Sequence, residues 1–349
     1  MFHHGGNLKS AMLAFAGAPQ PWIDLSTGIN PVPYPLGHLP AAVWTRLPEA
    51  ADIAGLEALA ALAWGAAPAA RIVAAPGTQA LIQWLPRLFP ARRVGILDFT
   101  YAEHAQVWRA AGAQVESVAS LAELAGFDVA VIVNPNNPDG RLVPAAGLAA
   151  LAAQMAQHGG LLVVDEAFAD VLAREASLVP RLTASCAALI LRSFGKTWGL
   201  AGLRLGFAVA APELATKIRI ALGPWAVSGP ALAIGAAALA DNAWLAQSTA
   251  RLTRDAARLD ALLAGAGFTG LCGTPLFRLG FHRNAARWFR QLGQAGILVR
   301  PFAGHPDRLR FGLPGAGDWD RLADCLNSPL AGLIPDAPPP GRQTSQTAL

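Results

Sequence analysis

The sequence predicts an α/β protein with a mostly parallel sheet, followed by a smaller α+β domain. Between about residues 70 and 210, short β-rich runs alternate with longer helical segments, as they do where helices join parallel strands. After about residue 215 the pattern changes to a long Ala-rich helix, a helix rich in Arg and Leu, and a few short strands. With 53% hydrophobic and 14% charged positions among 349 residues, the chain can bury a large core.

The individual elements follow from apolar runs and from the turn residues that bound them. Strands are predicted at residues 92–99, 127–133, 161–165, 188–193 and 205–210. Helices are predicted at residues 101–111 and 144–157, the second with a proline in its first turn. In the C-terminal part a helix is predicted at residues 244–263, and strands at residues 276–281 and 308–312.

These elements divide the chain into four predicted segments. They are an N-terminal arm at residues 1–40, a larger α/β domain at 41–215, a smaller α+β domain at 216–330 and a disordered tail at 331–349. The arm is expected to join the smaller domain and the substrate site. The tail is predicted from its proline and polar residues, which cannot form a packed core.

Charge, cysteines and hydropathy exclude several classes of function. The net charge is +4 and the basic residues are scattered, so no nucleic-acid surface is predicted. Three distant cysteines without a CxxC pair argue against a disulfide framework or a metal site, and fit a reducing cytoplasm. The uncharged residues 220–240 could span a bilayer by length, but two prolines and three glycines favour a buried loop and helix, so no membrane partner is predicted.

The strongest chemical signal is the segment SFGKTWGLAGLRLGF at residues 193–207. Lys196 follows a predicted buried strand and stands among glycines and small residues. Burial would lower the pKa of its ammonium and make it a nucleophilic amine, suited to forming a Schiff base. Ser193 and Arg204 flank it as possible phosphate ligands. The alternative interpretation is a surface lysine in a glycine-rich loop.

This segment resembles the lysine motif of the fold-type I pyridoxal-phosphate enzymes, the aspartate-aminotransferase superfamily. Three further motifs occur in that superfamily's order, PGTQ at residues 76–79, NPNNPDG at 134–140 and VDEAF at 164–168. Each is weak alone, but four in order make an accidental match improbable. The resemblance implies pyridoxal 5′-phosphate as cofactor, a large α/β/α domain with a small α+β domain, and a homodimer.

The resemblance also implies the residues that contact the cofactor. Gly77 would let the backbone turn, so that the amides of Thr78 and Gln79 at a helix N-terminus face the phosphate. Ser193 and Arg204 complete this phosphate site, and Lys196 is the covalent attachment point.

Three further residues are expected at the cofactor ring. Asp165 would pair with the pyridine nitrogen, Asn137 would hydrogen-bond the 3′ oxygen, and Tyr101 would stack on the ring. Without the neighbouring motifs, the same residues would be interpreted as a helix cap or turn former, a turn residue and a core aromatic.

Two positions depart from the superfamily pattern. Phe168 stands where many members have a tyrosine, so it cannot donate a hydrogen bond to the 3′ oxygen. Leu47 stands where many members have a tyrosine that reaches the neighbouring subunit's phosphate, so that bond is absent or replaced. Neither change removes a group that the cofactor requires to accept electrons from the substrate.

The beginning of the chain resembles threonine-phosphate decarboxylases of cobalamin biosynthesis. The carrying motifs are HGGN at residues 4–7 and DLSTGINP at 24–31. This resemblance implies conversion of L-threonine O-3-phosphate to (R)-1-amino-2-propanol O-2-phosphate and carbon dioxide. The alternatives are a histidinol-phosphate-type aminotransferase, and a non-catalytic domain that kept the fold.

The same resemblance implies a set of substrate-binding residues. They are His4, Gly5, Asn30, Asn137, Arg300 and Arg310. Arg308 is a neighbouring alternative to Arg310. Two arginines, a histidine and amide donors suit a substrate with a phosphate and a carboxylate.

Overall fold

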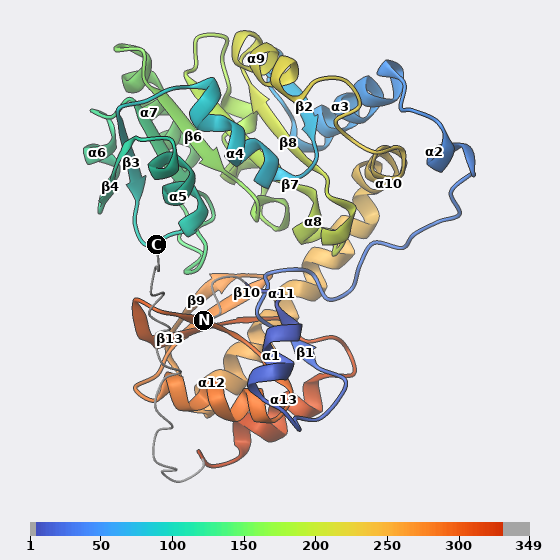
Figure 1. The fold of residues 1–349 in the computed structure, drawn as a ribbon, viewed down its shortest axis with the longest axis vertical. Coiled ribbons are helices and arrows are strands. Elements are labelled where there is room, and N and C mark those ends of the chain that lie inside the picture. Colours follow the sequence, from blue (N-terminus) through green and yellow to red (C-terminus); the bar gives the residue numbers. More distant parts are fainter. Residues whose placement is uncertain (1–4, 331–349) are drawn as a thin grey trace, which may run out of the picture.

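The computed structural model describes residues 5–330, which form two packed units joined by a long helix (Figure 1). The larger unit contains a seven-stranded sheet and the smaller a four-stranded sheet. The long helix is α11 (Asn242–Gly265), which runs from the larger unit into the smaller one. His4 and the predicted tail at residues 331–349 lie outside the described residues.

The large sheet has the strand order β2-β8-β7-β6-β5-β3-β4. Its strands are β2 (Arg71–Ala75), β3 (Arg93–Leu97), β4 (Gln114–Val118), β5 (Val129–Val133), β6 (Leu161–Asp165), β7 (Ala188–Ser193) and β8 (Gly206–Ala210). Only β8 runs antiparallel to its neighbours, so the predicted mostly parallel sheet is confirmed.

Helices cover both faces of this sheet, which explains why its central strands are apolar without alternation. In β6, Leu162 and Val164 face one core, and Leu161 and Val163 face the other. The helices are α2 (Ala42–Thr45), α3 (Ala50–Trp64), α4 (Thr78–Leu88), α5 (Ala102–Ala110), α6 (Leu121–Leu124), α7 (Ala145–Ala156), α8 (Phe194–Thr197), α9 (Pro212–Leu222) and α10 (Gly229–Ala240). Short 3-10 turns are η1 (Ala169–Val171), η2 (Arg174–Ala176), η3 (Val179–Arg181) and η4 (Ala201–Leu203).

The smaller unit is built on an antiparallel sheet of order β12-β13-β10-β9. Its strands are β9 (Thr269–Thr274), β10 (Phe277–Phe281), β12 (Arg300–Phe302) and β13 (His305–Gly312). Its helices are α1 (Leu8–Ala14), α12 (Ala285–Gln294), α13 (Trp319–Asn327) and most of α11. The N-terminal arm joins this unit, because β1 (Ile23–Asp24) pairs in parallel with β11 (Ile297–Leu298).

The observed elements differ from the prediction at the sheet edges and at the boundary between the units. The sequence missed β2 and β4; β4 is an edge strand whose polar sequence QVESV is mostly exposed. Helices α9 and α10 pack on the larger unit, where Ile218 and Leu232 join its cores, so the division lies beyond residue 215. The uncharged stretch at residues 220–240 is the end of α9, a loop and α10, and in the described chain no helix could cross a membrane.

Candidate active site

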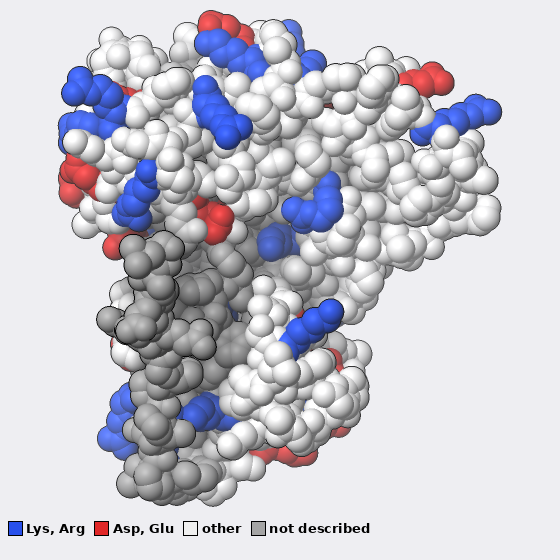
Figure 2. Space-filling view, in the orientation of Figure 1, with Lys and Arg blue, Asp and Glu red and all other residues white. Residues whose placement is uncertain are grey.

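A cavity of about 720 Å³ lies between the two units, at the carboxyl ends of the parallel strands. Asp165 ends β6, Lys196 follows β7, Asn137 follows β5 and Tyr101 follows β3, and all four side chains line the cavity. The carboxyl ends of parallel strands meet at one edge of a sheet, and α/β proteins bind ligands at this edge. Figure 2 shows basic side chains in the hollow between the units.

Lys196 is half-buried in α8, immediately after β7. Burial is the main cause that lowers the pKa of its ammonium to about 8; the charge of Arg310 contributes to this shift, while Asp165 opposes it. The Nζ atom lies 5.8 Å from the centre of the Phe168 ring. A fraction of Lys196 is therefore neutral and nucleophilic near neutral pH.

Asp165 is held by a partner that the sequence motifs do not reveal. Its Oδ2 lies 2.9 Å from Nε2 of His104, and the backbone N–H of Ala167 donates to its Oδ1 at 3.1 Å. His104 is fully buried on α5, one helical turn after Tyr101. The carboxylate is thus fixed by two donors and keeps its position at the cavity floor. The i, i+3 spacing from Tyr101 could have signalled His104.

The N-terminus of α4 forms a second part of the cavity wall. Gly77 adopts φ 84°, and a Cβ there would come within 2.7 Å of Nη2 of Arg204, so only glycine fits. Arg204 is itself held by a hydrogen bond from Nη1 to the carbonyl of Ala201 at 3.1 Å. Thr78 and Ser193 line the same region. Together these groups offer backbone donors, hydroxyls and one guanidinium to an anion.

Tyr101 and Gln79 form one wall with neutral side chains. Burial, with smaller contributions from the charges of Glu103 and Asp165, raises the pKa of Tyr101 to about 12. The Tyr101 hydroxyl donates to Oε1 of Gln79 at 3.4 Å, and Nε2 of Gln79 donates to Glu103 at 3.0 Å. The Gln79 side chain is therefore engaged in this chain of contacts, which leaves its backbone for an anion at α4.

Arg310 crosses from the smaller unit to the cavity. Its Nη1 donates to Oδ1 of Asn137 at 2.5 Å, and its Nη2 donates to the carbonyl of Ser26 at 2.7 Å. Burial, with a smaller contribution from the charge of Arg300, lowers the pKa of this guanidinium to about 9. Both acceptors are uncharged, and within residues 5–330 its Nε has no hydrogen-bond partner. A desolvated cation of this kind favours binding of an anion.

Arg300 joins Arg310, whereas Arg308 does not. Arg300 and Arg310 are direct cross-strand partners in the β12–β13 pair, and both line the cavity. Arg308 lies over the Phe281 ring at 4.7 Å and is outside the cavity wall. Of the two predicted alternatives, the structure therefore brings Arg310 to the site.

Asn30 is not brought to the cavity wall, although Gly5 and Gly28 of the same arm are. Its amide Nδ2 donates to the carbonyl of Thr197 at 2.8 Å, and its Oδ1 accepts from Arg251 at 2.7 Å. Its backbone N–H donates to the carbonyl of Lys196 at 3.0 Å. These bonds occupy the amide group, so Asn30 holds the turn that carries Lys196. The sequence had instead predicted that Asn30 contacts the substrate.

The two departures from the superfamily pattern lie in different places. Phe168 lines the cavity and packs edge-on against Phe277, with ring centres 5.0 Å apart. Leu47 is exposed and lies away from this cavity, beside α3 and α10. In this chain, Leu47 therefore contributes nothing to the site described here.

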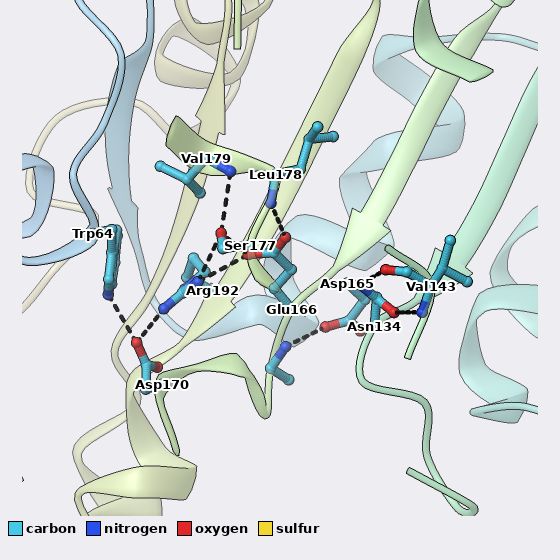
Figure 3. A network of polar contacts seen from close by, with 11 residues as sticks. Trp64, Asn134, Val143, Asp165, Glu166, Asp170, Ser177, Leu178, Val179 and Arg192 are labelled. Carbon is cyan, nitrogen blue, oxygen red and sulfur yellow. Dashed lines mark hydrogen bonds and ion pairs between the residues drawn. The ribbon is translucent and has the colours of Figure 1, made fainter. Parts of the chain in front are cut away.

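Behind the site, a buried ionic network fixes the ends of β6 and β7 (Figure 3). Arg192 binds Glu166 at 2.8 Å and also binds Asp170, whose other donor is Nε1 of Trp64 at 2.8 Å. Ser177 donates to Glu166 at 2.5 Å. Glu166 follows Asp165 directly and Arg192 lies four residues before Lys196, so this network supports the strand ends that carry both groups.

Replacing Arg192 with methionine should lower the free energy of unfolding by about 3–5 kcal/mol, because it leaves two buried carboxylates without a counter-charge. The matched control is Arg93→Met, which breaks the half-exposed ion pair with Glu116 at 3.1 Å. That pair should contribute at most about 1 kcal/mol. Urea unfolding of both variants measures the difference, and equal losses would contradict this account of the network.

Comparison with known proteins places this geometry among related chains. Residues 52–324 match the family model aminotransferase class I and II. A threonine-phosphate decarboxylase of Sinorhizobium sp is 44% identical over 330 residues, covering 93% of this chain and 97% of that protein. A protein of the same name from Pseudomonas aeruginosa is 41% identical over 334 residues, with the same coverage.

The fold is also found among solved structures. The crystal structure of histidinol-phosphate aminotransferase from Sinorhizobium meliloti, in complex with pyridoxal 5′-phosphate, superposes with a TM-score of 0.77. The two chains are 22% identical, and the match covers 92% of this chain and 93% of the other. This likeness shows a common fold.

Proposed function

This chain belongs to the class I and II aminotransferase family, and we propose that it removes the carboxylate of its substrate instead of exchanging the amino group. The proposed reaction converts L-threonine O-3-phosphate to (R)-1-amino-2-propanol O-2-phosphate and carbon dioxide, a step of cobalamin biosynthesis. One observation carries the proposal: Arg300 and Arg310 share a cavity with the amine of Lys196. The name of the relatives at 44% and 41% identity supports the same reaction.

The cofactor is pyridoxal 5′-phosphate, which when bound supplies an electron sink for the electron pair left by bond cleavage at Cα. The residues present fit this group. Lys196 offers an amine of lowered pKa for its aldehyde, and Asp165 offers a buried carboxylate for its ring nitrogen. Gly77 leaves space beside Arg204, where a Cβ would meet the guanidinium that is proposed to bind the phosphate.

The remaining cofactor contacts are assigned by position on the cavity wall. Thr78 and Ser193 would join the phosphate, and Tyr101 would cover one face of the ring. Asn137 would donate from Nδ2 to the 3′ oxygen, since its Oδ1 already accepts from Arg310. Because Phe168 has no donor, hydrogen bonding to that oxygen would rest on Asn137.

The substrate would bind at the opposite end of the cavity. Arg300 and Arg310 would contact its phosphate and carboxylate, aided by Asn137 and by the backbone at Gly5. His4 adjoins Gly5 in sequence and stays a predicted contact. Asn30 would serve as a positioning residue, because its hydrogen bonds hold the turn that carries Lys196.

Orientation of the carboxylate decides which bond at Cα breaks. If the arginines hold the phosphate and orient the bond between Cα and the carboxyl carbon for cleavage, the bound cofactor would accept the electron pair that this bond leaves. Carbon dioxide would then leave and a proton would take its place on Cα, with Lys196 Nζ as the proposed donor. If an arginine instead held the carboxylate so that the Cα–H bond was oriented for cleavage, amino transfer would follow.

A single assay separates the proposed reaction from transfer by a histidinol-phosphate-type aminotransferase. Purified, cofactor-loaded protein is given phosphothreonine without a keto-acid acceptor, and both gas and amine product are measured. Equal amounts of carbon dioxide and aminopropanol phosphate support the proposal. Absence of gas, with a keto product that appears only when an acceptor is added, would contradict it.

The lowered pKa of Lys196 predicts how cofactor capture depends on pH. Below about pH 8 the ammonium is protonated and has no lone pair to attack the aldehyde, and above it the amine is neutral. The capture rate by cofactor-free protein should therefore rise about tenfold from pH 7 to 9 and then level off. Stopped-flow absorbance measures this rate, and a continued rise to pH 10 would indicate an ordinary lysine.

We also assign the protein to the cytoplasm as a homodimer. Its three cysteines are free, which suits a reducing compartment. Trp44, Leu47 and Leu62 on and beside α2 and α3 are 65–74% exposed, and a second cavity of about 730 Å³ lies between α3 and α10. A second copy covering this apolar surface would explain it, and a monomer mass in analytical ultracentrifugation would contradict it.

A further inference from the structure

We propose that His305 is a further substrate-binding residue, which contacts the phosphate group together with Arg300 and Arg310 and so favours phosphorylated substrates. This inference rests on the proposed function and adds a specificity residue to it. Three observations support it: the residues of the β12–β13 hairpin that line the cavity, the contact of the His305 ring with Phe99, and the number of basic side chains available to the substrate anions.

His305 lies on the same hairpin as Arg300 and Arg310 and lines the same cavity. Arg300 pairs with Arg310, and Phe302 pairs with His305 across the turn. Direct cross-strand partners project from the same face of an antiparallel pair, but the register shifts between Pro301 and Phe302, so strand alternation alone does not place His305 beside Arg310. All four residues line the cavity, and this shared lining places His305 in the same space as the two arginines.

The His305 ring is held in place by Phe99 from the larger unit. The two ring centres are 4.3 Å apart at 60°, and Phe302 packs on the same Phe99 ring at 5.3 Å. The backbone of Phe99 is anchored, because its carbonyl accepts from Nδ2 of Asn136 at 2.8 Å. His305 is therefore ordered before the substrate arrives, and binding would cost little side-chain entropy.

The two anionic groups of the substrate can use a third basic side chain besides Arg300 and Arg310. The substrate carries a phosphate and a carboxylate, whereas Arg204 lies at the α4 end assigned to the cofactor phosphate. Arg300 and Arg310 then face both substrate anions. An imidazole N–H donates to a phosphate oxygen in either tautomer, so His305 can add a donor to those of the two arginines.

Steady-state kinetics of His305→Ala and His305→Gln test the assignment. His305→Ala should raise the KM for phosphothreonine about tenfold and leave kcat within about twofold, because binding is lost without loss of chemistry. His305→Gln keeps an N–H donor and should recover part of the loss. The matched control is Arg308→Gln, on the same hairpin and against the same Phe99 ring at 5.4 Å but outside the cavity wall, which should leave KM unchanged.

Binding of inorganic phosphate to the same cofactor-loaded variants, measured by calorimetry, gives a readout independent of turnover. The phosphate Kd should rise in His305→Ala in parallel with KM. Unchanged KM and unchanged phosphate Kd in His305→Ala would overturn the assignment, as would an equal effect of Arg308→Gln. Wild-type protein that releases no carbon dioxide would overturn the proposed function instead, while the phosphate titrations would still decide the role of His305.

Discussion

Lys196→Ala protein should release carbon dioxide from phosphothreonine at least about 10³-fold more slowly than the wild type, because it loses both the amine that holds the cofactor and the proposed proton donor. The side chain lies among Phe168, Arg310 and Asp165, none of which offers an amine to replace it. Single-turnover gas release with excess enzyme measures the chemical step directly.

The matched control for this variant is Lys217→Ala. Lys217 is half exposed on α9 and pairs with Glu213 at 3.3 Å, away from the cavity. Its replacement should leave the rate unchanged. Circular dichroism confirms that both variants fold, and a Lys196→Ala protein with wild-type turnover would contradict the role assigned to Lys196.

Asp165→Asn is expected to lower the rate of gas release by about 10²–10⁴-fold with little change in KM, since it removes a charge needed in the transition state. The side chain keeps its size, and its single amide oxygen can still accept from Ala167, while its Nδ2 faces Nε2 of His104, which accepts only in the other tautomer. What is lost is the negative charge that would keep the cofactor ring nitrogen protonated.

Replacing His104 tests how much the position of Asp165 matters, as distinct from its negative charge. His104→Gln keeps a donor to Asp165 but not the buried imidazole, so the loss should be smaller than that of Asp165→Asn. Stopped-flow kinetics of both variants give the comparison. A larger loss in His104→Gln than in Asp165→Asn would show that His104 has a direct role and does not act through Asp165.

Central elements of the fold could be predicted because burial on both faces leaves a continuous apolar run. β6 and β7 have the predicted bounds, whereas β2 and β4 lie at the sheet edges and were missed. β4 is mostly exposed, so its sequence need not be apolar. The position of α10 depends on packing against α3, which local sequence does not encode.

The site could be predicted where residues follow strand ends in one short motif. Lys196, Asp165 and Gly77 are of this kind. His104 was missed, because a single histidine on a helix looks like any core residue.

Two further features of the site, the position of Asn30 and the choice between Arg308 and Arg310, depend on irregular backbone. The bends around Gly28 and Asn30 turn the first toward the cavity and the second away from it. Arg308 and Arg310 are two residues apart on one strand, yet only Arg310 lines the cavity, since the register shifts in the adjoining part of the β12–β13 pair. Period-two patterns fail at such shifts.

The most direct measurement is chemical mapping of the cofactor attachment. Cofactor-loaded protein is treated with borohydride, which makes a carbon–nitrogen linkage permanent, and its peptides are analysed by mass spectrometry. The buried amine of lowered pKa predicts that the added mass falls on the peptide containing Lys196 alone. Label on Lys9 or Lys217 instead, or no label at all, would contradict the account of this site.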